Sequence, residues 1–336
     1  GLCVRSFIHA KGGRHRRPTH PARSAGLFMI LCLTPNPAID RSMDVDALQI
    51  GEVHRAKKTL AAAGGKGINV ARAIRTLGGE PLCMGPIGGH AGNLLADLAK
   101  GEGFSAHWTR VQNETRTCII LVQPNQDATV VNEVGQSIRA EECDALIHDV
   151  WEQSERVGLV SVSGSLPPGF PLERYQALLA GLVERGKSVW VDTSGPALKT
   201  ALTVSGIHIK VNAAELSEAL GVEISNAEQA AKAMQHLHQR GISQAVITLG
   251  RHGAVFSSEA GVWLAQPPQL KIVSSVGSGD AFLGGLLFAL ENGASSETAL
   301  QKAVAAGAAN TLEFGGGTFS LLFFEEIFQN TKISLM

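Results

Sequence analysis

A regular alternation of strand-like and helix-like segments constrains the fold of this chain more than any other feature of its sequence. From residue 138 onward, apolar runs such as "RVGLVSVSG", "SVWVDTSG" and "QAVITLGRHGAVFSS" alternate with helical patterns near 139–152, 171–186 and 226–240. Two further helices follow near the end. Strands that alternate with helices predict βαβ units. The chain is therefore predicted to be an α/β protein with a mostly parallel central sheet covered by helices on both faces.

Two β-like stretches interrupt this alternation in the first half of the chain. "MILCLTPNPAID" (29–40) is typical of a buried strand that ends in a proline-rich turn, and residues 65–79 form an amphipathic pattern closed by glycine. Segment 41–62 is β-like, and segment 115–135 indicates a hairpin that turns near residues 124–127. We expect these two segments to form a small β-sheet lid on a single domain that spans residues 29–336.

The charge of the chain is unevenly spread. Residues 1–28 hold six Lys and Arg and no acid, which leaves 23 basic and 30 acidic residues in the rest of the chain. This acidic body does not favour binding to nucleic acid or to an anionic membrane. Residues 1–28 also lack apolar periodicity and cannot offset their ordering entropy by burial, so we expect a disordered, dispensable extension. A transit peptide has such a composition, but we favour an upstream extension because a domain starts at Met29.

The cysteines and the apolar segments indicate the cellular compartment of the protein. The five cysteines are far apart, with no C-x-x-C pair and no metal-ligand spacing, and four lie in or beside apolar segments. Free buried thiols are the usual interpretation, and they favour a reducing, cytoplasmic compartment. No run of about 18 uncharged apolar residues occurs, so no membrane span is expected.

The segment "SSVGSGDAFLGGLLFALENG" (274–293) places a carboxylate where a strand-like run turns into a helix. Glycines at 277 and 279 allow the backbone to turn its N–H groups inward, and the helix adds the positive end of its dipole. This pattern predicts a site for an anion, with Asp280 at its centre. A carboxylate at this place is also a good helix cap, so the segment alone leaves both roles open.

Other segments decide between these roles. "GGKGINVARA" (64–73) and "VGSGDAFLGG" (276–285), together with "TPNPAID", "SGSLPPG", "VDTSG", "KVNAAEL", "ITLGRHGA" and "GGGT" in this order, closely resemble the ribokinase-like sugar kinases of the phosphofructokinase B group. The resemblance covers about residues 29–322 and is nearest to the hexose-phosphate kinases. It departs at Lys210-Val211-Asn212 (usually Lys-Pro-Asn) and at Ser278 (usually Ala). It implies a three-layer α/β/α ribokinase-like fold with a small β-sheet lid.

The resemblance implies roles for the phosphoryl-transfer side of the site. Asp280 would accept a proton from the sugar hydroxyl, and the N–H groups of Gly277, Ser278, Gly279 and Asp280 would form an anion hole. Asn212 and Glu215 would hold Mg²⁺ through its waters, which suits a cation that prefers oxygen ligands. Without the resemblance, this pair would be an exposed capping pair. Three further residues would lie along ATP: Thr248, Gly250 and Gly253.

The resemblance also implies an acceptor side. Asp40, Gly65 and Asn69 would hold the sugar hydroxyls, and Ser165 is a further candidate. Lys66 and Arg116 would bind the phosphate that the sugar already carries, a task that suits the planar fork of arginine. Without the resemblance, Asp40 would be an ordinary turn residue, and Lys66 and Arg116 would be surface charges.

The sequence therefore predicts an ATP- and Mg²⁺-dependent kinase of a ketohexose phosphate, with fructose 1-phosphate converted to fructose 1,6-bisphosphate as the first choice. Tagatose 6-phosphate and fructose 6-phosphate come next. A kinase of an unphosphorylated sugar or nucleoside is a weaker alternative, because a neutral acceptor does not need both Lys66 and Arg116. A non-catalytic nucleotide or sugar-phosphate sensor is the alternative from another class. Exposed lid sheets have edges and apolar faces that need covering, so we expect a homodimer through the lid.

Overall fold

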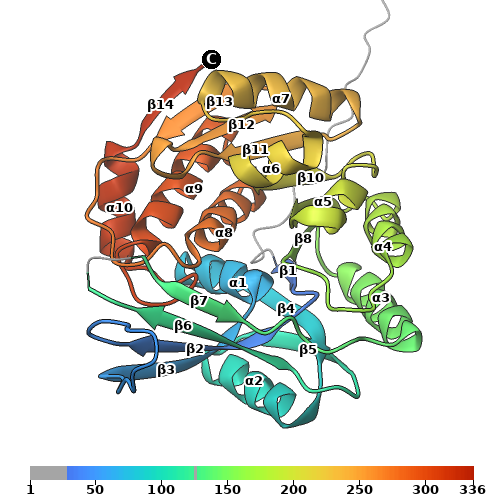
Figure 1. The fold of residues 1–336 in the computed structure, drawn as a ribbon. Helices are drawn as coiled ribbons and strands as arrows, with labels where there is room; N and C mark the ends of the chain where they lie inside the picture. The colour runs from blue at the N-terminus through green and yellow to red at the C-terminus, as the bar shows by residue number, and fades with distance from the viewer. Residues whose placement is uncertain (1–28, 125–126) are drawn as a thin grey trace, which may run out of the picture.

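The computed structural model describes residues 29–124 and 127–336, and its centre is one large sheet (Figure 1). The strands run in the order β14-β13-β12-β11-β10-β9-β8-β1-β4-β5. The pairs from β5 to β11 are parallel, and β12, β13 and β14 are added antiparallel. The bounds are β1 Met29–Leu33, β4 Glu80–Ile87, β5 Ser105–Arg110, β8 Leu159–Ser163, β9 Ser188–Asp192, β10 His208–Asn212, β11 Gln244–Thr248, β12 Ala254–Ser258, β13 Gly261–Gln266 and β14 Lys332–Leu335.

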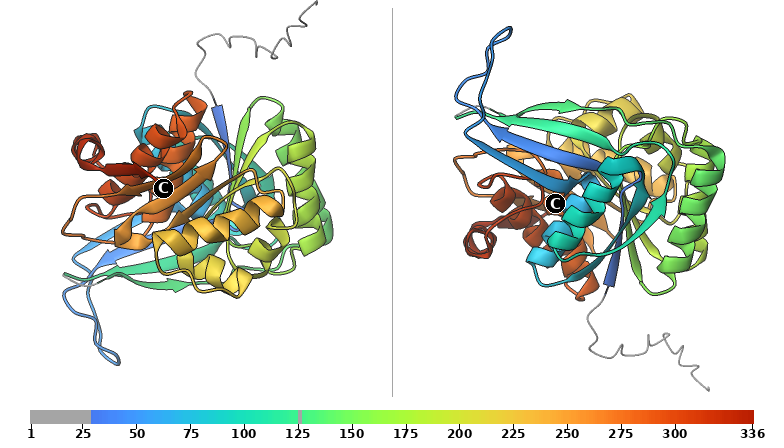
Figure 2. Two further views of the ribbon diagram at one scale, coloured as in Figure 1. Left: turned by 90° about the horizontal axis from the view of Figure 1, so that it is seen from above. Right: turned by 90° about the horizontal axis from the view of Figure 1, so that it is seen from below.

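Helices cover both faces of this sheet, as the alternation predicted (Figures 1 and 2). One face carries α3 Ala140–Ser154, α4 Leu172–Glu184, α5 Gly195–Ala201, α6 Ala213–Leu220 and α7 Ala227–Gln239. The other carries α1 Lys66–Thr76, α2 Gly89–Gly101, α8 Ser278–Glu291 and α9 Ser296–Asn310, with α10 Leu321–Asn330 packed against α9. A short 3-10 helix spans Gly250–His252. In β1, Leu31 and Leu33 pack on the first face and Ile30 and Cys32 on the second. The predicted fold class is therefore confirmed.

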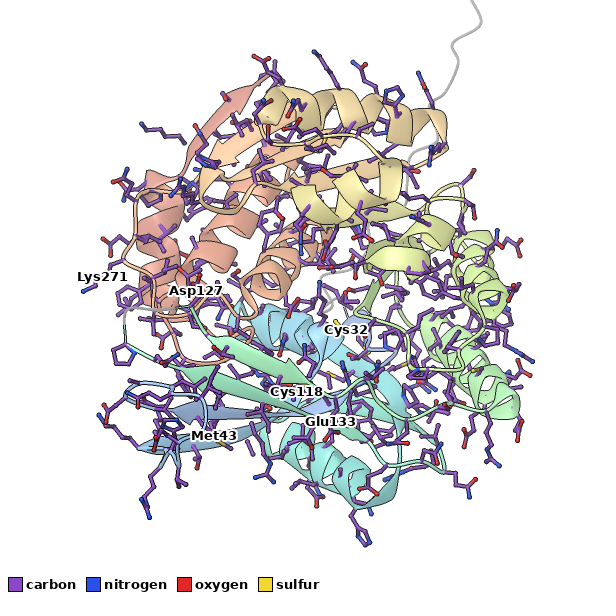
Figure 3. All side chains as sticks on the ribbon, viewed as in Figure 1. Cys32, Met43, Cys118, Asp127, Glu133 and Lys271 are labelled. Atoms are coloured by element: carbon purple, nitrogen blue, oxygen red, sulfur yellow. The ribbon has the colours of Figure 1, made fainter. Side chains whose placement is uncertain are left out.

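A second, four-stranded sheet stands apart from the large one. Its order is β3-β2-β6-β7, with β2 Ala38–Asp44, β3 Lys58–Gly64, β6 Arg116–Val122 and β7 Thr129–Asn132. Met43, Cys118 and Glu133 mark this sheet in Figure 3. The two interrupting segments therefore pair with each other, as expected. Ala38 pairs with both Gly64 and Arg116, and Arg116 donates to Asn36 O in the loop that follows β1 of the large sheet.

Strand order explains where a site can form. The chain runs from β1 to β4 and β5 on one side, and from β8 to β11 on the other, so the order reverses between β1 and β8. In sheets of this kind, ligands bind beyond the carboxyl ends of the strands at such a reversal. Asp192, Asn212 and Thr248 end β9, β10 and β11, and the register pairs Asn212 with Thr248.

Three sequence predictions remain to be placed. Cys32, Cys83, Cys118 and Cys143 are free and buried, as expected. None of the helices within residues 29–124 and 127–336 is long and apolar enough to span a membrane. The predicted extension 1–28, and part of the turn expected near 124–127, lie outside the described residues.

Candidate active site

Asp280 lies in the first turn of α8 and does not cap the helix. The N-cap position belongs to Gly277, which adopts the left-handed conformation (φ 76°), and no side chain of residues 29–124 or 127–336 caps this end. The carboxylate of Asp280 is buried, and its Oδ2 accepts a hydrogen bond of 2.9 Å from Nδ2 of Asn69. The structure therefore removes the capping alternative and leaves a carboxylate that is oriented by a second helix.

The backbone around Asp280 offers two free donors. The N–H of Ser278 donates to Ser275 O at 3.2 Å, and that of Asp280 to Gly277 O at 3.1 Å. Within the part of the chain that the structure describes, the N–H groups of Gly277 and Gly279 have no hydrogen-bond partner. Two of the four donors expected to form an anion hole are thus available at the positive end of α8.

Close packing of glycines keeps this turn in place. A Cβ at residue 277 would lie 2.4 Å from Cα of Gly316, so a side chain there would collide with backbone. A Cβ at residue 279 would lie 2.8 Å from Nζ of Lys210, which places that ammonium group directly against the turn. The bare backbone therefore serves close approach as well as the turn itself.

The environment of Asp280 suits a proton acceptor. Burial raises the pKa of its carboxyl group, and the negative charge of Asp192 raises it further. Lys66, Lys210 and the hydrogen bond from Asn69 act in the opposite direction. A carboxylate with a raised pKa binds a proton more readily in the transition state than an ordinary surface aspartate does.

A buried carboxylate joins two lysines beside Asp280. Asp192 is fully buried, and its two oxygens accept from Lys66 Nζ at 2.8 Å and from Lys210 Nζ at 2.6 Å. Burial alone would raise the pKa of Asp192, but the two ammonium groups hold it below its usual range. Burial would likewise lower the pKa of Lys66, yet Asp192, Asp280 and Glu215 raise it. Three functional groups thus meet at the carboxyl ends of the strands.

The sequence motifs predicted no role for Lys210 or Asp192. A signal was nevertheless present, because Lys210 stands alone inside the apolar strand run "IHIKVN". A lysine in a buried strand needs a carboxylate or another ligand nearby. Which acid would supply it could not be read from the sequence, since Asp192 lies 18 residues away on a neighbouring strand.

On the acceptor side, Asp40 lies on β2 against the start of α1. Burial raises the pKa of its carboxyl group to about 6. Asp280 adds to this effect, while Arg72, Arg116 and a hydrogen bond from the Gly65 backbone oppose it. Asp280 is therefore close enough to Asp40 for its charge to raise the pKa of that carboxyl group.

Arg116 and Ser165 meet at the loop after β1. Arg116 Nη2 donates to Asn36 O at 2.9 Å and Nη1 to Glu133 O at 2.8 Å, while Asn36 Nδ2 lies 3.5 Å from Ser165 Oγ. Arg116 also lines a cavity together with Asn36, Asn113, Gly135 and Ser137. The guanidinium is thus anchored by carbonyl groups and retains further N–H donors.

The residues expected on the nucleotide side also have structural roles. Asn212 and Glu215 form a reciprocal capping box at the start of α6, with bonds of 2.8 and 3.0 Å. Thr248 lies beside Asn212 in the neighbouring strand. Gly253 has φ 92°, and a Cβ there would lie 1.9 Å from Ala265 O, so the β11–β12 turn requires glycine. Gly250 likewise has positive φ, at 58°.

Comparison with known proteins identifies the family of this chain. The model of the pfkB family of carbohydrate kinases matches residues 33–321. A variant of phosphofructokinase-2 from Escherichia coli superposes with a TM-score of 0.84 at 29% identity, covering 91% of this chain and 99% of that one. A structure of that enzyme with fructose-6-phosphate gives 0.81 at 27%, with coverage of 91% and 99%. A Thermotoga maritima protein described as a possible 1-phosphofructokinase gives 0.79 at 22% (92% and 99%), which shows the fold alone.

The family model covers most of the chain, and it includes the elements that bring Asp40, Asn69, Arg116 and Asp280 to one site. The superpositions with the kinases among these structures cover 99% of the kinase chains. The chain therefore belongs to the pfkB family of carbohydrate kinases and is a phosphotransferase that acts on a sugar hydroxyl.

Proposed function

We propose that this sugar kinase transfers the γ-phosphoryl group of ATP to a ketohexose monophosphate, with fructose 1-phosphate as the preferred acceptor and fructose 1,6-bisphosphate as the product. One observation carries the chemistry. Asp280 is a buried, Asn69-oriented carboxylate at the start of a helix whose Gly277 and Gly279 N–H groups are free among the described residues. A proton acceptor and anion donors thus adjoin one another, as phosphoryl transfer requires.

The reaction follows from these groups. A sugar hydroxyl beside Asp280 attacks the γ-phosphorus in line, its proton passes to the carboxylate, and the bond to the β-phosphate oxygen breaks as ADP leaves. The free N–H groups of Gly277 and Gly279 donate to the moving phosphoryl oxygens. Lys210 holds its ammonium group against the same turn, in a buried position where charge interactions are strong.

Mg²⁺ fits the donor set near Glu215. The capping box occupies only Oε2 of Glu215, and the electrostatic effect of this carboxylate on Lys66 supports a position near the site. The free oxygen can accept from water molecules on Mg²⁺, which retains several waters in proteins. When bound, the ion would neutralise charge on the nucleotide phosphates. The described residues contain no cluster of three or more His, Cys, Asp or Glu that could hold a metal ion by protein ligands alone.

The charges around the acceptor favour one orientation of a sugar phosphate. A cavity of about 500 Å³ extends from Asp40 under the small sheet and is lined by Leu60, the acidic Asp97 and Arg72, whose charge is paired with that of Glu102. An anionic group is disfavoured there. The cavity beside Arg116 offers a guanidinium with free donors, which suits a phosphate. We therefore place the acceptor phosphate at Arg116 and the sugar ring at Asp40.

An activity panel tests the proposal directly. Purified protein is assayed with ATP and Mg²⁺ against fructose 1-phosphate, fructose 6-phosphate, tagatose 6-phosphate and fructose. We expect the highest kcat/KM with fructose 1-phosphate. Preference for fructose 6-phosphate would identify the second candidate, which the Escherichia coli structure with that ligand supports. Preference for fructose would reject a phosphorylated acceptor.

Substitution of Arg116 by alanine should weaken binding of the sugar phosphate. A charge-assisted contact to phosphate is lost, while Asp280 and the free N–H groups remain, so we expect the KM for the sugar phosphate to rise about tenfold or more. The KM for ATP should stay within twofold. Equal increases in both values would show that Arg116 supports the structure or the nucleotide instead.

The pKa of Asp40 predicts a pH dependence of acceptor binding. As an anion, Asp40 can accept hydrogen bonds from two sugar hydroxyls, and it becomes protonated as the pH falls through about 6. We expect kcat/KM for the sugar phosphate to fall about tenfold per pH unit below this value, as for a single essential base. The inflection should disappear in Asp40→Asn. If it survives in that variant, it belongs to Asp280, the other acid that faces Asp40 beside Arg72 and Arg116.

The arrangement of the small sheet supports two proposals: that the sheet is a lid, and that it joins two copies of the chain. The strand register places three residues on one face of this sheet: Asp40, Arg116 and Cys118. The opposite face carries Ile119 and Val131, which are paired on neighbouring strands. The side chains of Ile119 and Val131 are 37% and 57% exposed. We propose that this apolar face is covered in a homodimer. Light scattering of Ile119→Asp against wild type tests the idea, and a monomeric wild type would reject it.

A further inference from the structure

Arg72 is the most fully bonded side chain near the candidate base. It lies one helical turn after Asn69 on α1, so both residues occupy the same face of the helix. Nε and Nη2 donate to the two oxygens of Glu102 at 2.6 and 2.9 Å, and Nη2 also donates to Ala63 O at 2.6 Å. Nη1 donates to Asn69 Oδ1 at 2.7 Å and to Gly316 O at 2.6 Å. These bonds use all five N–H donors of the guanidinium.

This bonding decides which end of the Asn69 amide meets Asp280. An amide presents an oxygen or an NH₂ group with nearly the same shape, and only the NH₂ group can donate to a carboxylate. Because a guanidinium can only donate, Arg72 must face Oδ1 of Asn69, and Nδ2 is thereby directed to Oδ2 of Asp280 at 2.9 Å. With the amide reversed, an oxygen would face the carboxylate and a second donor would face Arg72.

The surroundings hold this arrangement rigidly. A Cβ at Gly316 would lie 2.7 Å from Nδ2 of Asn69, and a Cβ at Gly317 would lie 2.2 Å from its backbone oxygen, so the glycine loop packs directly on Asn69. Arg72 binds the same loop through Gly316 O and the end of α2 through Glu102, with an exposed side-chain fraction of only 14%. The guanidinium thus ties three other segments, at Ala63, Glu102 and Gly316, to one orientation of Asn69.

We propose that Arg72 is the positioning residue of this kinase: it fixes the amide of Asn69 and, through it, the carboxylate of Asp280. The inference rests on the proposed role of Asp280 as the base. Arg72 acts on the reacting atoms only through Asn69, so its effect on turnover requires Asn69. Its influence on Asp40 concerns acceptor binding and is read separately, in the KM for the sugar phosphate.

A double-mutant cycle with Arg72→Met and Asn69→Ala tests this dependence. We expect Arg72→Met to lower kcat about a hundredfold, the scale of a misplaced catalytic group, with the KM for ATP within twofold. In the Asn69→Ala background, the same substitution should lower kcat by less than threefold further. If the two losses multiply instead, Arg72 acts independently of Asn69 and the proposal fails.

Arg75→Met is the matched control, because it removes the same charge from the next turn of α1, where Arg75 donates only to Gly103 O among the described residues. Its kcat should stay within twofold of wild type. If Arg72→Met does not fold, Arg72→Lys replaces it in the cycle, since lysine keeps the charge but cannot supply five donors. A fall in kcat that matches only the folded fraction of the variant would assign Arg72 a purely structural role.

A second measurement needs no turnover. The side-chain amide signal of Asn69 in a ¹⁵N-labelled sample is identified by its loss in Asn69→Ala. In wild type and Arg75→Met, we expect one shifted signal with slow solvent exchange, and in Arg72→Met a loss of that protection. An unchanged signal in Arg72→Met overturns the inference. Wild-type protein that is inactive on every sugar of the panel would overturn the proposed function, while this measurement would still decide the positioning of Asn69.

Discussion

Replacing Asp280 by asparagine should lower kcat by about 10²–10⁴-fold, the usual effect of losing a general base, or roughly 3–5 kcal/mol of barrier. Asparagine keeps the shape of the side chain, and its oxygen can still accept from Asn69 Nδ2. It cannot take the proton of the sugar hydroxyl. The dissociation constants of ATP and sugar phosphate, measured by calorimetry, should stay within several-fold, because the backbone donors of Gly277 and Gly279 are unchanged.

The melting temperature of Asp280→Asn should hardly move, since no cap is lost and burial of a neutral amide is less costly than burial of a charge. Glu297→Gln is a matched control, because Glu297 is an acid in the first turn of the neighbouring helix α9. It should leave kcat unchanged. An Asp280→Asn variant with near-normal kcat would leave the enzyme without a catalytic base at this site.

Replacing Asp192 by asparagine should have the largest effect on stability. Lys210 is buried, with a side chain 4% exposed, and Asp192 is its only ion-pair partner among the described residues. Removing one partner of a buried ion pair typically costs about 3–5 kcal/mol of unfolding free energy, because the other charge remains buried and uncompensated. Lys66 is 38% exposed and can turn to water, so Lys210 carries most of this cost. Urea unfolding at pH 7 measures the change.

Two comparisons make this prediction specific. Asp144→Asn breaks the exposed pair with Arg174 and should cost less than about 1 kcal/mol. The direction of the pH dependence of this stability contribution also follows, because the pKa of Asp192 is held low in the folded state. Its contribution is present above the unfolded pKa of about 3.9 and is lost as the pH falls further. The difference between wild type and Asp192→Asn should therefore shrink below pH 4. A constant difference across that range would point to a packing defect.

Much of the fold could be predicted from local patterns. Helix α1, expected over residues 65–79, is found at Lys66–Thr76, and the hairpin expected over 115–135 is the antiparallel pair β6–β7. Strand β14 was missed, because a four-residue strand at the end of a chain has no pattern of its own and forms only by pairing with β13. Its existence depends on a partner that is distant in sequence.

Most residues of the candidate site were predicted from sequence motifs. Glycine at 277 and 279 beside an acid predicts an anion site at this helix start, since bare backbone N–H groups and the helix dipole favour an anion. The roles at Asp40, Asn69, Arg116 and Asp280 came from motifs in a characteristic order. Arg72 was part of such a motif, but nothing in "NVARA" shows that its side chain reaches Glu102 and Gly316.

The sequence by itself therefore determined the α/β class and the two sheets, because periodicity and turn residues act over a few positions, and its family motifs supplied the candidate site residues. Only the tertiary structure decided how their side chains are oriented and charged. The strand order brings Asp192 between Lys66 and Lys210, and helix packing places Arg72 so that Asn69 donates to Asp280. Burial and charge depend on these long-range neighbours, which is why the raised pKa of Asp280 and the ion pairs of Asp192 could not be read from the chain alone.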